Sequence, residues 1–348
     1  GDFAGGTVQV AGTLDASAPT GGDGGFIDTS GAYVQIADEV TVTTKAEQGQ
    51  TGTWLIDPTD FTIAAGGGDK TVSSIGADTL TDNLKSTSVI LETVAGGNES
   101  GDIHVNSAVT WDKNQLTLSA HGDININANL NGSDQAKLAL EYGQGAVAAG
   151  NTANYHVNAK VNLPKGQNFS TKRGSDGNTI AYEVITTLGA HDSLTGTDLQ
   201  GINGNLAGHY VLGADIDASS TAGWNGGAGF SPIGDNSTNS NDSRFTGIFD
   251  GLGHSITELH INRPYKAHVG LFADTENSII RNVGLLGGSI TGLSNVGGLV
   301  GSNRGGTIEQ SYATGAVTGT DRVGGLVGDN YNGTIRQSYA TGAVTGTD

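Results

Sequence analysis

A tandem repeat with a 27-residue period fills the last part of the sequence and limits the folds that it can adopt. The segment VGGLVGSNRGGTIEQSYATGAVTGTDR starts at Val296 and is followed directly by VGGLVGDNYNGTIRQSYATGAVTGTD, so that 22 of 26 aligned residues are identical. A segment this short cannot bury an apolar face alone, and neighbouring copies must therefore stack on one another. The period predicts a solenoid.

The residues inside the repeat select β-structure. Glycine interrupts every window of helical length, whereas short β-prone runs stand between the glycines. We predict three strands and three corners per period, with glycine at corners that need a positive φ, and hence a right-handed parallel β-helix. The runs are Leu299-Val300, Thr307-Ile308 and Ala316-Val317-Thr318.

The same pattern continues upstream in weaker form. Val269-Gly270-Leu271-Phe272 stands one full period before Val296-Gly297-Gly298-Leu299 and predicts a third copy. In the first half of the chain, Ile124 to Asn131 alternates apolar residues with asparagine, which places the asparagine side chains together on the outward face of a strand. Stacked strands are therefore predicted along most of the chain.

Two interruptions divide the chain. Thr197-Asp198-Leu199-Gln200 fits a capping box, with Thr197 as the N-cap, and predicts a short helix of about two turns. The glycine-rich segment from Trp224 to Asn241 predicts a protruding loop. The predicted parts are a β-helix over 1–188, a lead-in with the helix and the loop over 189–244, and the repeat β-helix over 245–348, truncated at its C-terminal end.

Composition restricts the partners. The chain has 16 basic and 35 acidic residues, a net charge of −19, and no basic cluster, so we expect no binding to nucleic acid. It has no cysteine, which is compatible with export, and no run of apolar residues long enough for a membrane-spanning helix. Because it also has no methionine, we expect a fragment whose signal sequence lies upstream.

Catalytic and metal-binding patterns are weak. The nearest candidates for an acid–base pair are Asp215 with Asp217 and Glu258 with His260, which share strand faces two residues apart, and we interpret both pairs as solvated surface. His254, His260 and His268 do not have the spacing of zinc ligands. We predict no catalytic residue, no cofactor and no metal site.

Aromatic residues are the best candidates for ligand contact. Tyr312 and Tyr339 occupy the same position in successive copies and should stack as a ladder. Such ladders are usually structural, but an outward tyrosine row is also a surface on which sugar rings can stack. Trp224, at the start of the predicted loop, is the third possible surface contact.

The tetrads Gly298-Leu299-Val300-Gly301 and Gly325-Leu326-Val327-Gly328 resemble the GLUG repeat. The first half, through Trp54-Leu55-Ile56-Asp57-Pro58 and the strand from Gly122 to Ile126, resembles filamentous-haemagglutinin-like exoproteins of Gram-negative bacteria. This resemblance implies a large secreted adhesin of two-partner secretion systems, exported through an outer-membrane transporter and displayed or shed at the cell surface. The family's secretion domain has no counterpart in this sequence, and the family supplies no catalytic residues.

These patterns together predict a non-enzymatic fragment of a secreted bacterial adhesin. Its partners would be the outer-membrane transporter and a host receptor, matrix or polysaccharide ligand, as in biofilm formation or virulence. Two alternatives stay open. The fragment could be a passive spacer shaft without binding activity, or a β-helical enzyme that degrades polysaccharide, since such enzymes also use parallel β-helices.

Overall fold

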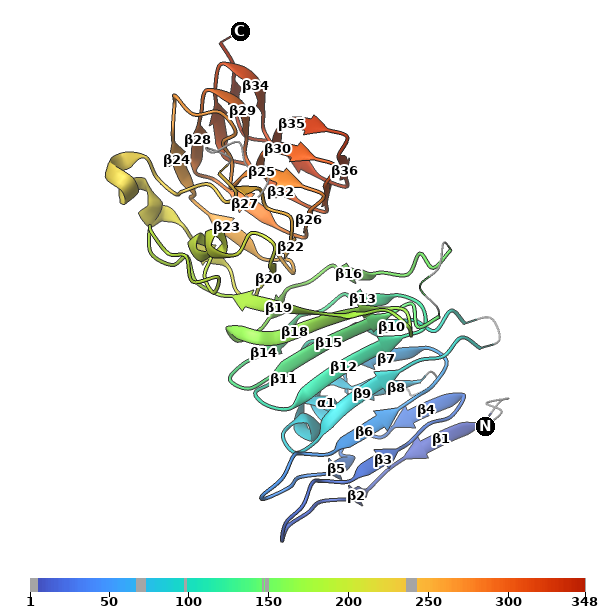
Figure 1. The fold of residues 1–348 in the computed structure, drawn as a ribbon. Coiled ribbons are helices and arrows are strands. Elements are labelled where there is room, and N and C mark those ends of the chain that lie inside the picture. Colours follow the sequence, from blue (N-terminus) through green and yellow to red (C-terminus); the bar gives the residue numbers. More distant parts are fainter. Residues whose placement is uncertain are drawn as a thin grey trace. The chain divides into compact units, whose positions relative to one another are not determined.

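The computed structural model describes residues 6–66, 73–96, 99–145, 147, 150–235 and 243–347. The chain folds as two compact units. Unit 1 contains Gly1–Pro164 and Asn168–Ala181, and unit 2 contains Lys165–Gln167 and Tyr182–Asp348. In both units the strands pair in parallel with the equivalent strand of a later segment, as the short parallel ribbons of Figure 1 show. The prediction of an all-β chain is confirmed.

The described residues of unit 1 form four stacks of parallel strands. The longest stack runs in the order β1 (Thr7–Val10), β4 (Tyr33–Ile36), β8 (Ser74–Gly76), β7 (Phe61–Ala64), β10 (Ile103–Val105), β13 (Ile124–Ile126) and β16 (Tyr155–Val157). The second runs through β3 (Phe26–Asp28), β6 (Thr53–Ile56), β9 (Ser88–Glu92), β12 (Gln115–Ala120), β15 (Lys137–Tyr142) and β18 (Gly166–Arg173). Shorter stacks contain β11 (Val109–Trp111), β14 (Leu130–Gly132) and β17 (Val161–Asn162), and β2 (Thr13–Asp15) with β5 (Thr41–Thr43).

The core of unit 1 follows from the alternation of apolar and polar residues along these strands. Ile103 pairs with Ile124 and Leu116 with Leu138, and these side chains are buried. The asparagine row lies outside, as predicted, and is itself bonded. Asn127 Nδ2 donates to Asn106 Oδ1 at 2.9 Å. The outward amides therefore form a hydrogen-bonded ladder from one strand to the next.

The α-helix α1 (Ala77–Leu84) was not predicted from the sequence. It lies between β8 and β9, and buries Leu80 and Leu84, which are four residues apart and so share one helix face. The side chain of Asn83 is also buried and donates to the Val40 carbonyl at 2.9 Å. Because the helix is only two turns long, its stability comes from this packing rather than from a strong sequence signal.

In the part of unit 2 that the structure describes, the parallel strands form five stacks. Two of them run through β19 (Thr179–Ile185), β20 (His209–Leu212), β22 (Ile248–Asp250), β26 (Ile279–Arg281), β31 (Thr307–Glu309) and β36 (Thr334–Arg336), and through β21 (Ile216–Asp217), β23 (Ser255–Thr257), β27 (Gly284–Leu286), β32 (Tyr312–Ala313) and β37 (Tyr339–Ala340). The others contain β24 (His260–Asn262), β28 (Ser289–Thr291), β33 (Ala316–Thr318) and β38 (Val344–Thr345), then β25 (Phe272–Glu276), β30 (Val300–Arg304) and β35 (Val327–Tyr331), and finally β29 (Ser294–Gly297) and β34 (Asp321–Gly324).

Successive copies of the repeat stack directly on one another in unit 2. We call residues 269–295 the Arg281 layer, 296–322 the Glu309 layer and 323–347 the Arg336 layer. Pairing between the last two keeps the 27-residue offset throughout, for example Val300 with Val327. Val269 bridges to Val296 in parallel, so the weaker copy joins the stack as predicted.

Each period contributes five short strands, not the predicted three. The three predicted runs correspond to β30, β31 and β33. Strand β32 was missed because it is only two residues long, and β34 because its residues, Asp-Arg-Val-Gly, are mostly not β-prone. Tight corners separate the strands, and most of these corners are not glycine. Gln310 and Gln337 both have a positive φ, of 48° and 50°, between β31 and β32 and between β36 and β37.

The repeat's glycines serve mainly for close approach between layers. A Cβ atom on Gly298 would lie 2.4 Å from the carbonyl oxygen of Gly325 in the next layer. No side chain fits there without moving the backbone, so the tetrad glycine follows from the stacking distance.

The predicted helix near residue 197 is a 3₁₀-helix, η1 (Gln200–Gly204), and Thr197 is not its cap. Asp198 Oδ1 accepts the Gly201 N–H at 2.7 Å, so Asp198 stabilises the first turn instead. Gly201 and Gly204 disfavour a longer α-helix. The first part of the predicted loop forms another 3₁₀ segment, η2 (Ser219–Gly227), with a kink at Trp224, while 236–241 lie outside the described residues.

The boundaries between the three predicted parts of the chain, at residues 188 and 244, remain predictions. No described helix is both long and apolar enough to cross a membrane.

Candidate functional site

The two tyrosines predicted to form a ladder stack face to face. Tyr312 on β32 is in register with Tyr339 on β37, and their ring centroids lie 5.3 Å apart with an interplanar angle of 7°. The in-register position one layer earlier is Gly284, where an added Cβ would lie 2.4 Å from the Tyr312 ring. Tyr312 therefore lies flat over a glycine, and Tyr339 continues the stack.

This tyrosine stack presents an aromatic face to solvent. Tyr339 is 56% exposed and Tyr312 is half-buried beneath it. The flat face of an aromatic ring can pack against the C–H groups of a sugar ring or against an apolar side chain. Ligand contact at these residues stays a prediction.

Trp224 is part of a different cluster. Its ring stacks on Phe230 at 6.3 Å with an interplanar angle of 20°, and it meets His191 edge-on at 6.3 Å. Phe230 is fully buried, whereas Trp224 is half-buried against the core of unit 2. The structure thus gives Trp224 a packing role that holds η2 on the core, and only part of its ring is free for other contacts.

Charged residues of opposite sign alternate along one strand stack of unit 2. Asp250, Arg281, Glu309 and Arg336 are in register on β22, β26, β31 and β36. Arg281 Nε lies 2.8 Å from Asp250 Oδ2, Arg281 Nη1 lies 3.9 Å from Glu309 Oε1, and Arg336 bonds to Glu309. We call these four residues the charge row. Sequence reasoning missed it, because only the register brings residues so far apart in the chain together.

A second buried carboxylate lies between arginines from different segments. Asp274 is fully buried, and Arg244 and Arg304 each bring Nε within hydrogen-bond distance of it, at 3.3 and 3.1 Å. Burial alone would raise the pKa of Asp274, but hydrogen bonds from His268 and Arg304 and their positive charges outweigh it and lower that pKa. Asp274 is therefore held ionised as a structural link between layers.

Three of the four residues considered as catalytic pairs make similar structural contacts. Asp215 Oδ1 accepts the Ser255 N–H at 2.9 Å. Asp217 Oδ1 accepts the Ser219 N–H at 2.8 Å at the start of η2, and these hydrogen bonds from Ser219 lower the pKa of Asp217. His260 Nδ1 lies 2.8 Å from Ser289 Oγ on the neighbouring strand. Each of these side chains links adjoining segments of the fold.

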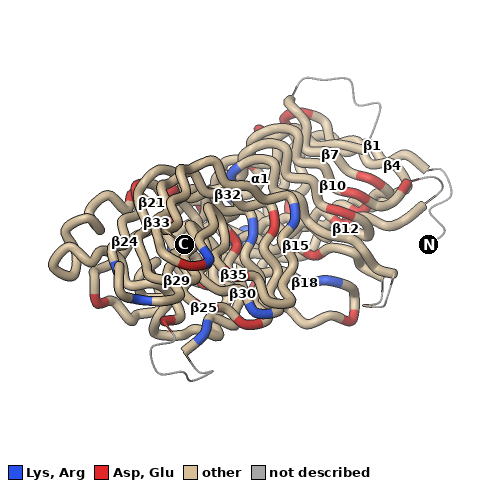
Figure 2. Tube along the Cα trace, turned by 90° about the horizontal axis from the view of Figure 1, so that it is seen from above, with Lys and Arg blue, Asp and Glu red and all other residues tan. Residues whose placement is uncertain are grey.

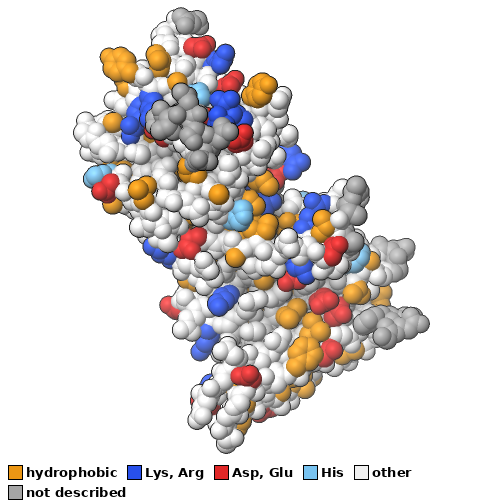
Figure 3. Space-filling model, in the orientation of Figure 1, with side chains coloured by type: hydrophobic (Ala, Val, Ile, Leu, Met, Phe, Trp, Pro, Cys, Tyr) orange, Lys and Arg blue, Asp and Glu red, His pale blue; other side chains and the backbone are white. Residues whose placement is uncertain are grey.

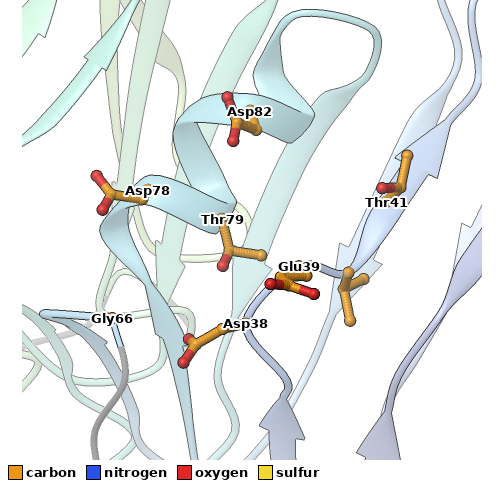
Figure 4. A pocket seen from close by; sticks show the side chains of 8 residues that line it. Asp38, Glu39, Thr41, Gly66, Asp78, Thr79 and Asp82 are labelled. Atoms are coloured by element: carbon orange, nitrogen blue, oxygen red, sulfur yellow. The ribbon is translucent and has the colours of Figure 1, made fainter.

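Unit 1 has a cavity of about 320 Å³ beside α1. Four of its lining residues are acidic, namely Asp38, Glu39, Asp78 and Asp82. Figure 4 shows their carboxylates pointing in different directions rather than at a common centre. Accordingly, no group of three acidic or histidine side chains suited to a metal ion occurs among the described residues.

Unit 1 also carries carboxylates with raised pKa values. Burial, together with the negative charges of Glu92 and Asp28, raises the pKa of Asp57 to about 6. Burial and the charge of Glu141 raise the pKa of Glu92.

Acidic residues gather beside β10 and β12 (Figure 2). On the face drawn in Figure 3, basic side chains are interspersed with acidic and neutral ones, unlike the continuous basic surface of a nucleic-acid-binding protein.

Comparison with known protein families identifies the motif that the tandem repeat contains. Residues 292–318 and 319–345 match the GLUG motif. The chain carries two GLUG motifs. This finding confirms the resemblance drawn from the two tetrads, and both tyrosines of the stack, as well as Glu309 and Arg336, lie within the matched segments.

Two relatives match longer stretches of the chain than a single GLUG motif does. A halomucin of Haloquadratum walsbyi is 39% identical over 199 residues, which is 54% of this chain. A putative Gly-rich membrane protein of Evansella cellulosilytica is 40% identical over 101 residues, which is 28% of this chain. The aligned segments span 2% and 11% of the lengths of these relatives. No solved structure matches the chain.

Proposed function

We propose that this chain is part of a large cell-surface or secreted protein, in which it forms a stacked shaft. The two GLUG motifs and the similarity to a halomucin and to a protein named as a membrane protein support this assignment. The small share of those relatives that the chain spans agrees with a segment of a much longer polypeptide. We further propose that the stacked strands of each unit wind as a right-handed parallel β-helix, because parallel pairing of each strand with the equivalent strand of a later segment is typical of that architecture.

The shaft would act as an adhesin through the tyrosine stack. The observation that carries this proposal is the stacked, outward pair Tyr312 and Tyr339, placed in consecutive GLUG motifs. A polysaccharide or matrix glycan is the class of ligand that suits a flat aromatic face, and repeated layers would allow multivalent contact. Host cells and biofilm matrix are surfaces that carry such ligands.

We also propose export through the outer-membrane transporter of a two-partner secretion system. The support is the resemblance of the first half of the chain to haemagglutinin-like exoproteins, together with the absence of cysteine. Co-expression with such a transporter, behind a matching secretion domain, should release the chain into the medium. Retention in the periplasm would count against this route and would leave the adhesin proposal intact.

Glycan and matrix arrays test the adhesin proposal. Wild type should bind at least one polysaccharide or matrix component, and Tyr339→Ala should lose most of that binding. Tyr331→Ala is the matched control, because Tyr331 is 62% exposed but is not part of the stack. Equal loss in both variants, or binding unaffected by Tyr339→Ala, would show that the stack is not the binding surface.

A passive spacer is the second candidate, because the repeat copies 296–321 and 323–348 are identical at all but four of 26 aligned positions, so that few residues are specific to one layer. Deleting residues 296–322 removes one complete layer. Adhesion that survives this deletion together with Tyr339→Ala would favour the spacer.

We propose that the chain is not an enzyme. Polysaccharide cleavage that is lost on changing Asp215 or Asp217 would overturn this proposal.

A further inference from the structure

The Glu309 layer and the Arg336 layer differ at only four aligned positions, and the Arg281 layer beneath them shows what these differences mean. Ser302, Arg304, Gly305 and Glu309 in the Glu309 layer become Asp329, Tyr331, Asn332 and Arg336 in the Arg336 layer. In the Arg281 layer, Asp274, Glu276 and Arg281 are in register with Ser302, Arg304 and Glu309. Asn277 directly follows Glu276, as Gly305 follows Arg304. At three of the four positions, the Arg281 layer therefore has the same residue as the Arg336 layer, and not that of its immediate neighbour.

This pattern puts opposite charges in contact at each junction. Arg281 has Asp250 on one side and Glu309 on the other, and Glu309 in turn bonds to Arg336. Asp274 of the Arg281 layer pairs with Arg304 of the Glu309 layer at 3.1 Å. Two layers of the same kind in direct contact would place arginine on arginine, or glutamate on glutamate, about 4.8 Å apart. Like charges directly opposite each other on neighbouring strands are destabilising.

The outer face of the Arg336 layer exposes charged and apolar side chains together. Arg336 meets Glu309 on one side only, and its side chain is 59% exposed. Asp329 is in register with Ser302, which is in register with Asp274, so it occupies the position from which Asp274 reaches Arg304. Apolar side chains are exposed on the same layer: Ile335 by 40%, Tyr339 by 56% and Val344 by 47%.

We propose that the layers are of two alternating kinds, and that the outer face of the Arg336 layer is a docking surface for a further 27-residue layer of the Glu309 kind. Such a layer would place a carboxylate opposite Arg336 and an arginine beside Asp329, and would cover Ile335 and Val344. Its own tyrosine would lie on Tyr339, so that the tyrosine stack would continue and its outermost ring would still be exposed. Charge complementarity therefore favours a layer of the Glu309 kind over one of the Arg336 kind. A layer of the Arg336 kind would bring arginine onto arginine at the same point. This inference concerns assembly of the stack and does not rest on the proposed ligand.

Two extended chains test the proposal. Each chain is extended after Asp348 by one arginine, which corresponds to the arginine that follows Asp321. One more layer comes after this arginine. The first carries VGGLVGSNRGGTIEQSYATGAVTGTD and the second VGGLVGDNYNGTIRQSYATGAVTGTD, which differ at four positions only. Because nothing in the parent chain is changed, neither extension can fail by unfolding the parent.

Hydrogen exchange of the Arg336-layer amides reports docking. We expect the first extension to slow exchange in β35 and β36 about tenfold more than the second, with the difference shrinking as salt rises. A third chain carries the second extension with glutamate in place of the arginine that aligns with Arg336. This chain should recover most of the protection. Equal protection by the first two extensions, or better protection by the second, would overturn the proposal. Concentration-dependent dimerisation of the unextended chain through this face would also overturn it, because a second copy would then be the occupant.

Discussion

Replacing Glu309 should destabilise the repeat part of unit 2, by an amount that depends on the replacement. The Glu309 side chain is 6% exposed and carries the only negative charge between Arg281 and Arg336 in the charge row. Glu309→Gln keeps the shape and removes the charge. Arg281 keeps its bond to Asp250, and Arg336 can turn to solvent because it is 59% exposed. Hydrogen bonds to charged groups contribute about 1.5–3 kcal/mol each, so we expect a loss of about 2 kcal/mol.

Glu309→Arg should cost more, about 4 kcal/mol, because it places a third positive charge between two others in a buried row. The double variant Glu309→Arg with Arg336→Glu restores the outer pair but leaves arginine against Arg281, so it should recover only part of the loss. Asp321→Asn is the control. Asp321 and Arg322 form a pair 4.0 Å apart, both side chains are 59% exposed, and the change should be below about 0.5 kcal/mol.

Native-state hydrogen exchange of the amides in β26, β31 and β36 measures these free energies locally, which avoids treating a chain of two units as one cooperative transition. A loss below about 0.5 kcal/mol for Glu309→Gln, equal to the control, would refute the reasoning that the charge row stabilises the stack. So would a double variant as stable as wild type, because Arg281 would then have no preference for the charge at position 309.

Two further changes probe the other parts of the fold. The pKa of Asp57 in the folded chain, about 6, lies above its ordinary 3.8, so this carboxylate favours folding below pH 4 and the stability is lost as pH rises through 6. Asp57→Asn should therefore raise the melting temperature at pH 7 and change it little at pH 4; an equal effect at both values would contradict the assigned cause. Gly298→Ala should cost about 3 kcal/mol or more, because its Cβ would lie 2.4 Å from the Gly325 carbonyl oxygen, whereas Gly223→Ala, with nothing within 4 Å, should be close to neutral in the same denaturant titration.

Some features of this protein could be read from single residues and their spacing. The period alone predicts that Tyr312 and Tyr339 stack, because an offset of one period puts identical side chains in register. The alternation of isoleucine and asparagine from Ile124 to Asn131 likewise predicts which side chains are buried, because the two faces of a strand are set by parity.

Other features needed the fold. Asp198, not Thr197, accepts a hydrogen bond from the first turn of η1, because η1 begins at Gln200 and not directly after Thr197 as the capping box implies. The local sequence of helix α1 is too weakly helical to predict it, and the helix is stabilised because Leu80 and Leu84 are buried in the core. Trp224 was predicted as a surface contact, and the structure places much of its ring on Phe230.

The sequence by itself determined that the chain stacks, which residues recur on each layer, and which tyrosines meet. Only the tertiary structure decided which unlike residues meet across layers. The step in sequence number along the charge row is 31 from Asp250 to Arg281, but only 27 from Glu309 to Arg336. No single period aligns the four residues of the row. The corners between short strands absorb the extra residues, and that adjustment brings the four charges into one row.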